Sequence, residues 1–346
     1  MTLGPTNGAS VLTKTRFEQA MLARLHENHR RYVMAQRGAI RAILRQCDLS
    51  GLNFRGMNFS DAEMIACNFK GADLRGAVFN RANIFTANFD NANLSGADLA
   101  RADLRGARFE RADLTDAQLL GADLRRGAVI GEKAVIDDQQ GSKFNFAVLR
   151  GTNLANARLR AAEFHGAIVS DANFAAADLR EVSFRGAELI NLNLAGAQLA
   201  GADLRGAIVS GDILKSLEMS GAHVGKPPLS EKALETCLGE HARWIGSSGL
   251  QGSRADLASR DLSGVDLSEA NLAAANLELS LLVKAQLRGA LLVAAKLSGA
   301  NLQGADLTGA DLRGADLLDA NLRHANLDRA KIGALPGTTL VTLLPA

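Results

Sequence analysis

Large apolar residues recur at every fifth position over much of the 346-residue chain. The first run comprises Leu49, Phe54, Phe59, Met64, Phe69, Leu74, Phe79, Ile84, Phe89, Leu94, Leu99, Leu104, Phe109, Leu114, Leu119 and Leu124. Two residues before each of them stands a smaller residue, usually Ala, and Asp or Asn often separates the two. A period of five fits neither a helix nor a simple strand. It predicts a solenoid whose five-residue units each form one side of a coil, with the small and large residues inside.

The recurring "ADL" and "ANL" units resemble those of the pentapeptide repeat family, over residues 47–124, 147–224 and 255–332. That resemblance implies an all-β solenoid, a right-handed quadrilateral β-helix with four units per coil. Residues twenty apart then stack at strand spacing. Phe69, Phe89 and Phe109 are expected to form one internal column, and Cys47 and Cys67 to be neighbours in small inward positions.

The pattern is lost over residues 125–143. Leu124 and Phe144 are nevertheless twenty residues apart, which is the length of one coil. We therefore expect the stack to continue through a degraded coil, or through a loop that stands in for one. A loop on a rigid scaffold is a common place for function.

The second run of repeats is out of step with the first, because thirty-three residues separate Val224 from Leu257. The segment that precedes each run explains the break, since His29 in the first aligns with His241 in the second once one residue is inserted. The interruption is thus interpreted as the head of a second module.

Each head is expected to begin as an amphipathic helix that covers the open end of its solenoid, where unpaired strand edges would favour aggregation. Thr15 and Glu18 suggest a capping box for the first helix, and Ser230 suggests an N-cap for the second. The predicted divisions are a disordered tail (1–13), a helical head (14–46), a first β-helix (47–224, with the degraded coil or loop at 125–143), a linker and second head (225–254), a second β-helix (255–332) and a C-terminal cap or tail (333–346).

No catalytic constellation is evident in the sequence. The six histidines are scattered, and although His26 and His29 are three apart, no further metal ligands converge near them. The aspartates occupy the polar position of the repeat, which suits a turn, and there is no Gly-rich phosphate loop. We expect no enzyme activity, cofactor, metal or small-molecule substrate.

Cysteine usage and hydropathy indicate the compartment. Three cysteines without a CxxC pair favour reduced thiols, and no apolar stretch is long enough for a membrane helix. The prediction is a bacterial, cytoplasmic protein without a transmembrane segment.

Exposed apolar positions give the best candidates for binding. The residue after the large core residue should face solvent, and it is apolar at Ile65 and Phe85, which are twenty apart. With Arg105 and Arg125 they form a candidate partner-binding surface, unless the head or the 125–143 segment covers them. If residues 125–143 keep the twenty-residue register, His165, Arg185 and Arg205 continue this surface on later coils. Carboxylates two residues before several of these positions favour local charge pairing instead.

These features favour a non-catalytic scaffold that presents rigid faces to an unidentified protein partner. The family resemblance implies one alternative, since one branch binds DNA gyrase as a DNA-like rod, but that mimicry uses an acidic surface and the net charge here is +2. Another alternative is binding of anionic membrane or nucleic acid by the basic head, with candidates Arg24, Arg30, Arg31, Arg37 and Arg41.

Overall fold

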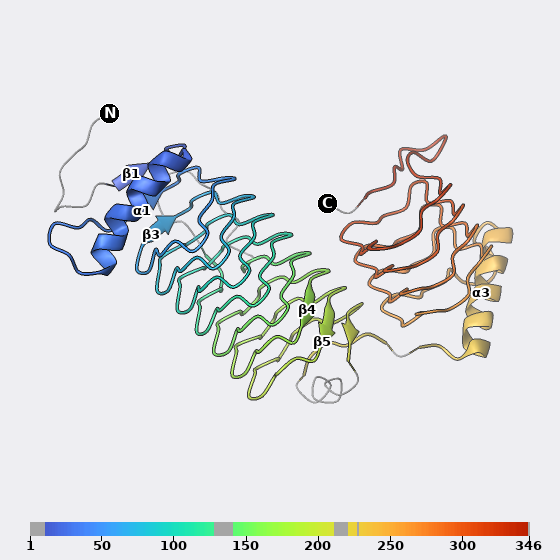
Figure 1. Cartoon of the computed structure of the whole chain (residues 1–346). Coiled ribbons are helices and arrows are strands. Elements are labelled where there is room, and N and C mark those ends of the chain that lie inside the picture. Colours follow the sequence, from blue (N-terminus) through green and yellow to red (C-terminus); the bar gives the residue numbers. More distant parts are fainter. Residues whose placement is uncertain (1–10, 128–140, 211–220, 227, 345–346) are drawn as a thin grey trace. The chain divides into compact units, whose positions relative to one another are not determined.

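The computed structural model describes residues 11–127, 141–210, 221–226 and 228–344 (Figure 1). The chain divides into two compact units, one made mainly of residues before His223 and the other mainly of His223–Ala346. The regular elements are β1 (Val11–Thr13), α1 (Gln19–Val33), β2 (Ile43–Arg45), β3 (Glu63–Ile65), β4 (Ile168–Ser170), β5 (Glu188–Ile190), β6 (Ile208–Val209) and α3 (Glu231–Gly246).

Parallel bridges between residues twenty apart build the stack in both units. In the first unit they join Asn53 to Asp73, Asn58 to Val78, Glu63 to Asn83 and Asn68 to Asn88, one pair on each of four successive five-residue sides. The repeating layer is therefore twenty residues, or four pentapeptides, as predicted. In the second unit the same spacing recurs, for example between Asp256 and Asn276. The large residue of nearly every unit is buried in its core.

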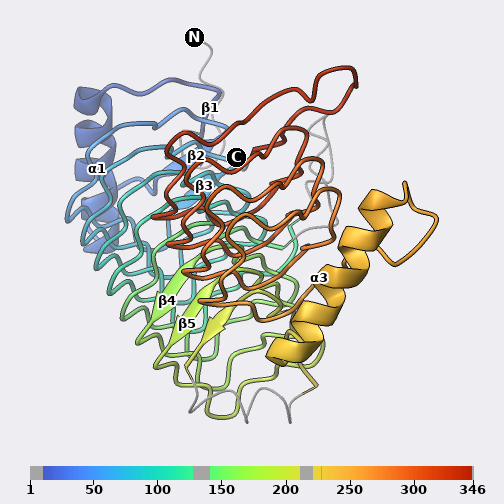
Figure 2. The same ribbon diagram turned by 90° about the vertical axis from the view of Figure 1, so that its right-hand side faces the viewer.

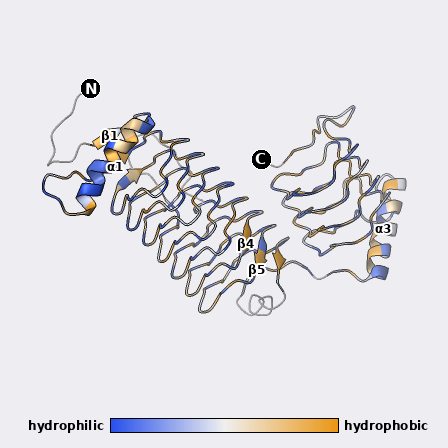
Figure 3. Cartoon of the chain, in the orientation of Figure 1, coloured by the Kyte–Doolittle hydropathy of each residue, from blue (hydrophilic) through white to orange (hydrophobic). Residues whose placement is uncertain are grey.

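Local hydrogen bonds explain why the unit is five residues long. At each corner the amide of the small residue donates to the carbonyl of the preceding large residue, as Ala72 does to Phe69 at 2.9 Å. One corner residue has positive φ, a conformation that Gly71 adopts easily. The polar residue accepts from the amide two positions on, as Asn93 Oδ1 does from Ser95 at 3.0 Å. This contact accounts for the Asp or Asn in the repeat. Figure 3 shows the resulting alternation of hydropathy along the coils.

A column of phenylalanine rings runs through the core of the first unit. Ring centroids are 4.8 Å apart for Phe69 and Phe89, and 4.9 Å for Phe89 and Phe109. The column predicted from the twenty-residue spacing is thus confirmed. The next ring is that of Phe144, 4.7 Å from Phe109, and Phe164 follows at 4.6 Å. The column therefore continues across the segment where the repeat pattern is lost.

The register across that segment differs from our expectation. Arg108 pairs with Lys143 and Asp123 with Arg158, so partners here are thirty-five residues apart rather than twenty. Phe144 is therefore the large core residue of the side that comes directly after the side of Leu124. The prediction that residues 125–143 replace one coil is wrong. The amide of Ser142 donates to Leu124 O at 3.3 Å, which is the usual corner bond. The segment is an insertion of fifteen residues at a single corner.

Glycines form the first and last positions of this insertion. An added Cβ at Gly127 would lie 2.6 Å from the carbonyl oxygen of Arg105, and one at Gly141 would lie 2.5 Å from that of Ala161. Neither position has room for a side chain, because the backbone packs directly on the neighbouring coil.

The N-terminal end of the first unit differs from two expectations. Residues 11–13 form β1, which pairs in parallel with β2, and β2 pairs with β3. The predicted disordered tail of residues 1–13 is therefore wrong for these three residues, and the other ten lie outside the described part of the chain. The predicted capping box is also absent, because Glu18 is the N-cap of α1 without a side-chain hydrogen bond and the Thr15 hydroxyl donates to Thr13 O.

Side chains of α1 bind backbone groups of the first coil. Gln19 donates to Asn53 O at 2.8 Å and accepts from Asn53 N at 2.9 Å, and His26 Nε2 accepts from Asn58 N at 3.1 Å. His29 is fully buried, accepting from Ala42 N through Nδ1 at 3.1 Å, with Nε2 2.9 Å from Ser60 O. On these sides the helix makes hydrogen bonds to backbone groups that would otherwise need a preceding coil as their partner.

Helix α3 has the corresponding place in the second unit, beside the first coils of that unit (Figure 2). Ser230 caps it, accepting from Ala233 N at 3.3 Å as predicted. Leu234, Cys237 and Leu238 pack against the leucine core. His241 repeats the role of His29, since its Nδ1 accepts from Ala255 N at 3.1 Å. Among the described residues, no helix has the length and apolarity needed to cross a membrane.

Candidate functional site

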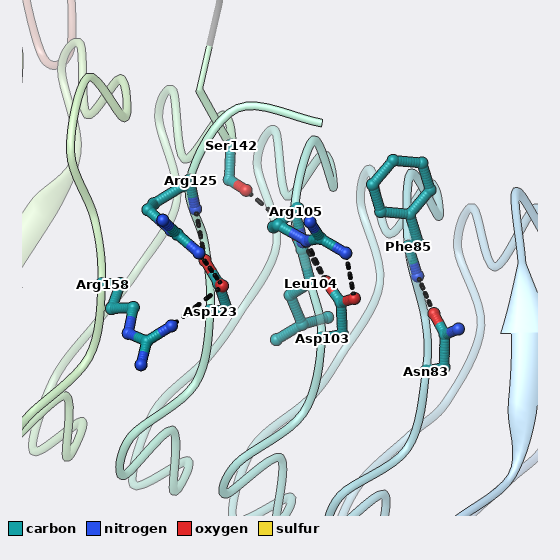
Figure 4. A network of polar contacts seen from close by, with 9 residues as sticks. All are labelled: Asn83, Phe85, Asp103, Leu104, Arg105, Asp123, Arg125, Ser142 and Arg158. Carbon is teal, nitrogen blue, oxygen red and sulfur yellow. Dashed lines mark hydrogen bonds and ion pairs between the residues drawn. The ribbon is translucent and has the colours of Figure 1, made fainter. Parts of the chain in front are cut away.

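One side of the first unit carries a column of side chains from successive coils. The column, called here the arginine column, consists of Ile65, Phe85, Arg105, Arg125, Arg160 and Arg180. Each stands two residues after a member of one bridge ladder, which runs Glu63, Asn83, Asp103, Asp123, Arg158 and Asp178. Three consecutive members, Phe85, Arg105 and Arg125, lie in a row on adjacent coils (Figure 4).

The insertion changes which residues belong to this column. Counting in twenties placed His165, Arg185 and Arg205 after Arg125, and that expectation is wrong because the true step is thirty-five residues. His165 instead lies on the next side of the coil, where its Nε2 is 2.7 Å from Ser183 Oγ. Arg185 and Arg205 share Asp203 there, at 2.6 and 2.7 Å.

The central arginines are held by carboxylates two residues before them. Arg105 binds both oxygens of Asp103 through Nε and Nη2, at 2.9 and 2.7 Å, and Arg125 binds Asp123 with the same distances (Figure 4). Burial opposes ionisation of Asp123, but hydrogen bonds from Arg125 outweigh it and hold the pKa of this carboxyl below its usual value. The predicted local charge pairing is confirmed, and it orients the guanidinium groups.

Ile65 and Phe85 begin the column as half-buried residues. Ile65 ends β3 and pairs with Arg45 of β2. The Phe85 ring lies 5.2 Å from the guanidinium carbon of Arg105, within the range of a cation–π contact. This end of the surface therefore combines apolar and aromatic area with oriented positive charge.

A hollow of about 350 Å³ opens farther along the column, beside the insertion. Its lining residues are Arg105, Arg125, Arg126, Arg160, Ala161 and Glu181. Arg160 Nη2 lies 2.6 Å from Glu181 Oε1. Arg126 is exposed and forms no ion pair within the described ranges. Sequence reasoning missed Arg160 and Glu181, because only the thirty-five-residue step brings them to this side. It also missed Arg126, although this residue directly follows Arg125.

Comparison with protein families settles the class of the chain. The family model described as "Pentapeptide repeat region" matches residues 40–119, and the model "Pentapeptide repeats (8 copies)" matches residues 140–174, 170–206, 253–292 and 295–332. Together these matches cover more than half of the sequence. The chain belongs to the pentapeptide repeat family. Family membership implies the right-handed quadrilateral β-helix that the resemblance predicted.

Solved structures similar to this pentapeptide repeat protein are members of the same family. HetL, involved in heterocyst differentiation regulation in the cyanobacterium Nostoc sp. strain PCC 7120, is 20% identical, with coverage of 94% of this chain and 99% of HetL and a TM-score of 0.21. QnrB1, a plasmid-mediated fluoroquinolone resistance protein, is 19% identical, with 60% and 95% coverage and a TM-score of 0.26.

A third pentapeptide repeat protein, from the thylakoid lumen of Arabidopsis thaliana, is 24% identical, with 49% and 77% coverage and a TM-score of 0.23. No curated protein matches the sequence. TM-scores this low identify no shared site and no shared partner.

The basic head of this pentapeptide repeat protein is only partly free to bind anions. Arg30 pairs with Glu27 at 2.8 Å, Arg41 lies 3.8 Å from Glu63, and Arg31 Nε donates to Gln36 at 3.2 Å. Arg24 and Arg37 are exposed. Internal pairing thus holds the guanidinium groups of three of the five candidates.

The histidines and cysteines of the head have structural surroundings. His26 and His29 bind backbone groups, and no cluster of three potential metal ligands occurs in the residues that the structure describes. Burial lowers the pKa of His29. Cys47 and Cys67 are free thiols in the core, at 1% and 0% exposure, on successive coils as expected.

Proposed function

We propose that this protein is a non-catalytic scaffold whose arginine column binds an acidic segment of a protein partner. The observation that carries the proposal is the alignment of half-buried apolar residues with oriented guanidinium groups along one rigid side. Arginine and aromatic residues are enriched at protein interfaces and at their energetic centres. A cytoplasmic location would suit the three free thiols.

Rigidity is what the fold adds to this surface. The side chains stand on backbone ladders, and the bidentate pairs with Asp103 and Asp123 fix the direction of two guanidinium groups. Groups ordered before binding lose less conformational entropy when a partner docks. An extended acidic segment laid along the column would meet Arg105, Arg125, Arg160 and Arg180 in turn.

We also infer that α1 and α3 cap their respective solenoids. The hydrogen bonds of Gln19, His26 and His29 to the first coil support this role for α1, and the matching bond of His241 supports it for α3. In that role the helices protect coil edges, which leaves the sides of the coils for recognition.

The proposal is tested by capture of partners from cells of the source organism, using a matched pair of variants. Arg105→Glu reverses a charge in the column. Arg75→Glu changes an arginine that binds Asp73 in the same bidentate way, with similar exposure, two sides away around the coil. We expect a partner with an acidic segment to be lost from Arg105→Glu and from the double variant Ile65→Arg, Phe85→Arg, and to be retained by Arg75→Glu. Equal capture by all variants would refute the docking surface.

Mimicry of DNA toward gyrase is the second candidate, and the same experiment addresses it. A DNA-like surface needs unpaired acidic charge, whereas Asp103, Asp123 and Asp178 are each bound by an arginine on this side. Recovery of gyrase with every variant would favour mimicry over the proposed surface. Binding through the basic head would instead appear as salt-sensitive binding to anionic membrane or nucleic acid that is lost when residues 1–40 are removed.

A further inference from the structure

The hollow beside the insertion gathers more positive charge than the rest of the arginine column. Five guanidinium groups line or adjoin it, those of Arg105, Arg125, Arg126, Arg158 and Arg160, against three carboxylates, those of Asp103, Asp123 and Glu181. Counted over the described residues, the local excess is two positive charges. It arises because the insertion places Arg158 and Arg160 on the coil that stacks directly after Arg125.

The paired arginines still have hydrogen-bond donors to offer. A guanidinium group carries five N–H donors. Arg105 uses Nε and one Nη2 hydrogen on Asp103, Arg125 does the same on Asp123, and Arg160 uses Nη2 on Glu181. Most donors of each group therefore remain available. Arg126 adds a guanidinium group with no ion pair in the described chain.

This arrangement distinguishes between kinds of anion. A single carboxylate brings one charge and two oxygens, and carboxylates of the chain already satisfy that geometry. A phosphoryl group brings up to two charges and three terminal oxygens, which can accept from several guanidinium groups at once without displacing Asp103, Asp123 or Glu181. The local excess of two positive charges matches a phosphate dianion.

We propose that the hollow lined by Arg105, Arg125, Arg126 and Arg160 is a binding site for a phosphoryl group. The hollow has room for the group together with the atom chain that carries it. The phosphoryl group can belong to a phosphorylated side chain of the docked partner or to free phosphate, and the chemistry of recognition is shared. The role of this site in partner recognition rests on the proposed function. The binding test uses only the protein and small anions, so it does not depend on that function.

The test is calorimetric titration of the full chain with inorganic phosphate, phosphoserine and acetate, at low salt and neutral pH. The site variant is Arg126→Ala, Arg160→Ala. The control variant is Arg55→Ala, Arg75→Ala, which removes two positive charges from the opposite side of the first unit. Circular dichroism and the unfolding midpoint establish that both variants fold.

We expect phosphate and phosphoserine to bind the wild type at least tenfold more tightly than acetate. The site variant should lose tenfold or more of that affinity, and the control variant should lose less than twofold. Binding should also weaken as salt rises, because the contacts are ionic. Tighter binding of phosphoserine than of phosphate would assign the site to a modified side chain, and the reverse order to free phosphate.

Absence of phosphate binding, equal binding of acetate, or equal losses in the two variants would overturn the site. These outcomes are separable from the scaffold proposal, because partner capture is judged on Arg105→Glu and on Ile65→Arg, Phe85→Arg. A partner lost from those variants, together with no phosphate binding, would leave the scaffold standing and remove only the phosphoryl site.

Discussion

Removal of residues 127–141 should leave the first solenoid intact. The deletion joins Arg126 to Ser142 and restores a five-residue interval between Leu124 and Phe144. Ser142 already makes the corner bond to Leu124 O, and its hydroxyl donates to Leu104 O at 2.9 Å. Arg126 would take the corner position of positive φ, which Arg81 adopts with φ of 57°.

The size of the effect follows from loop closure. Closing a loop of fifteen residues costs about 2 kcal/mol of chain entropy, from (3/2)RT ln n. The deletion should therefore change the free energy of unfolding by no more than about 2 kcal/mol, in the stabilising direction. If the segment were instead part of a coil, its deletion would remove three sides with their core residues. Each lost core residue would lower the free energy of unfolding by about 2–5 kcal/mol.

Urea unfolding followed by circular dichroism distinguishes these cases. The matched control is deletion of residues 92–106, which also removes fifteen residues but takes them from regular repeats. We expect that control to unfold at a much lower urea concentration than the wild type. A comparable loss in the 127–141 deletion would refute the register described here.

Three further predictions concern core packing, one histidine and the cysteines. Phe144→Ala should lower the free energy of unfolding by about 3–5 kcal/mol, as Phe89→Ala should, because both rings stack on neighbours in the core. A decrease below about 1 kcal/mol in urea unfolding would place Phe144 outside the stack. Burial lowers the pKa of His29, so its contribution to folding stability is fully present above the ordinary pKa of 6.5 and declines as pH falls below that value. The thermal unfolding midpoint should therefore fall less between pH 7.5 and pH 5.5 in His29→Ala than in the wild type. Iodoacetamide should label the partly exposed Cys237 before Cys47, which is 1% exposed. Mass spectrometry of the native protein measures the order of labelling, and the reverse order would contradict the prediction.

The five-residue period predicted most of the fold because a single pattern sets both the core and the corners. The buried large residues, the small inward positions and the Asp or Asn turns all follow from one unit, so each repeat supports the same prediction. The second head was also predictable, since His29 and His241 accept from equivalent amides in the two units.

The register at the insertion was not predictable from that period. Any insertion whose length is a multiple of five keeps the frame, so a gap of twenty residues between Leu124 and Phe144 fits one full coil or one side with fifteen extra residues. Only the contacts of Phe144 with Phe109 and of Asp123 with Arg158 separate the two. The same ambiguity hid Arg160 from the candidate site.

Strand pairing with the first coil explains why the helix-start prediction was wrong. Thr15 and Glu18 have the spacing of a capping box, but residues 11–13 continue as a strand against the first coil. Thr15 accordingly binds Thr13 O, and Glu18 itself becomes the N-cap. Pairing with residues thirty-two positions later, which this sequence spacing does not reveal, decides where the helix begins.

The central claim is that the arginine column is the docking surface. Its most direct test is photo-crosslinking in source cells with a photoreactive phenylalanine analogue at position 85, and the same analogue at position 75 on the opposite side of the coil as the control. The account predicts one crosslinked protein partner at position 85 that is absent at position 75. Crosslinking of the same partner at position 75, with none at position 85, would contradict it.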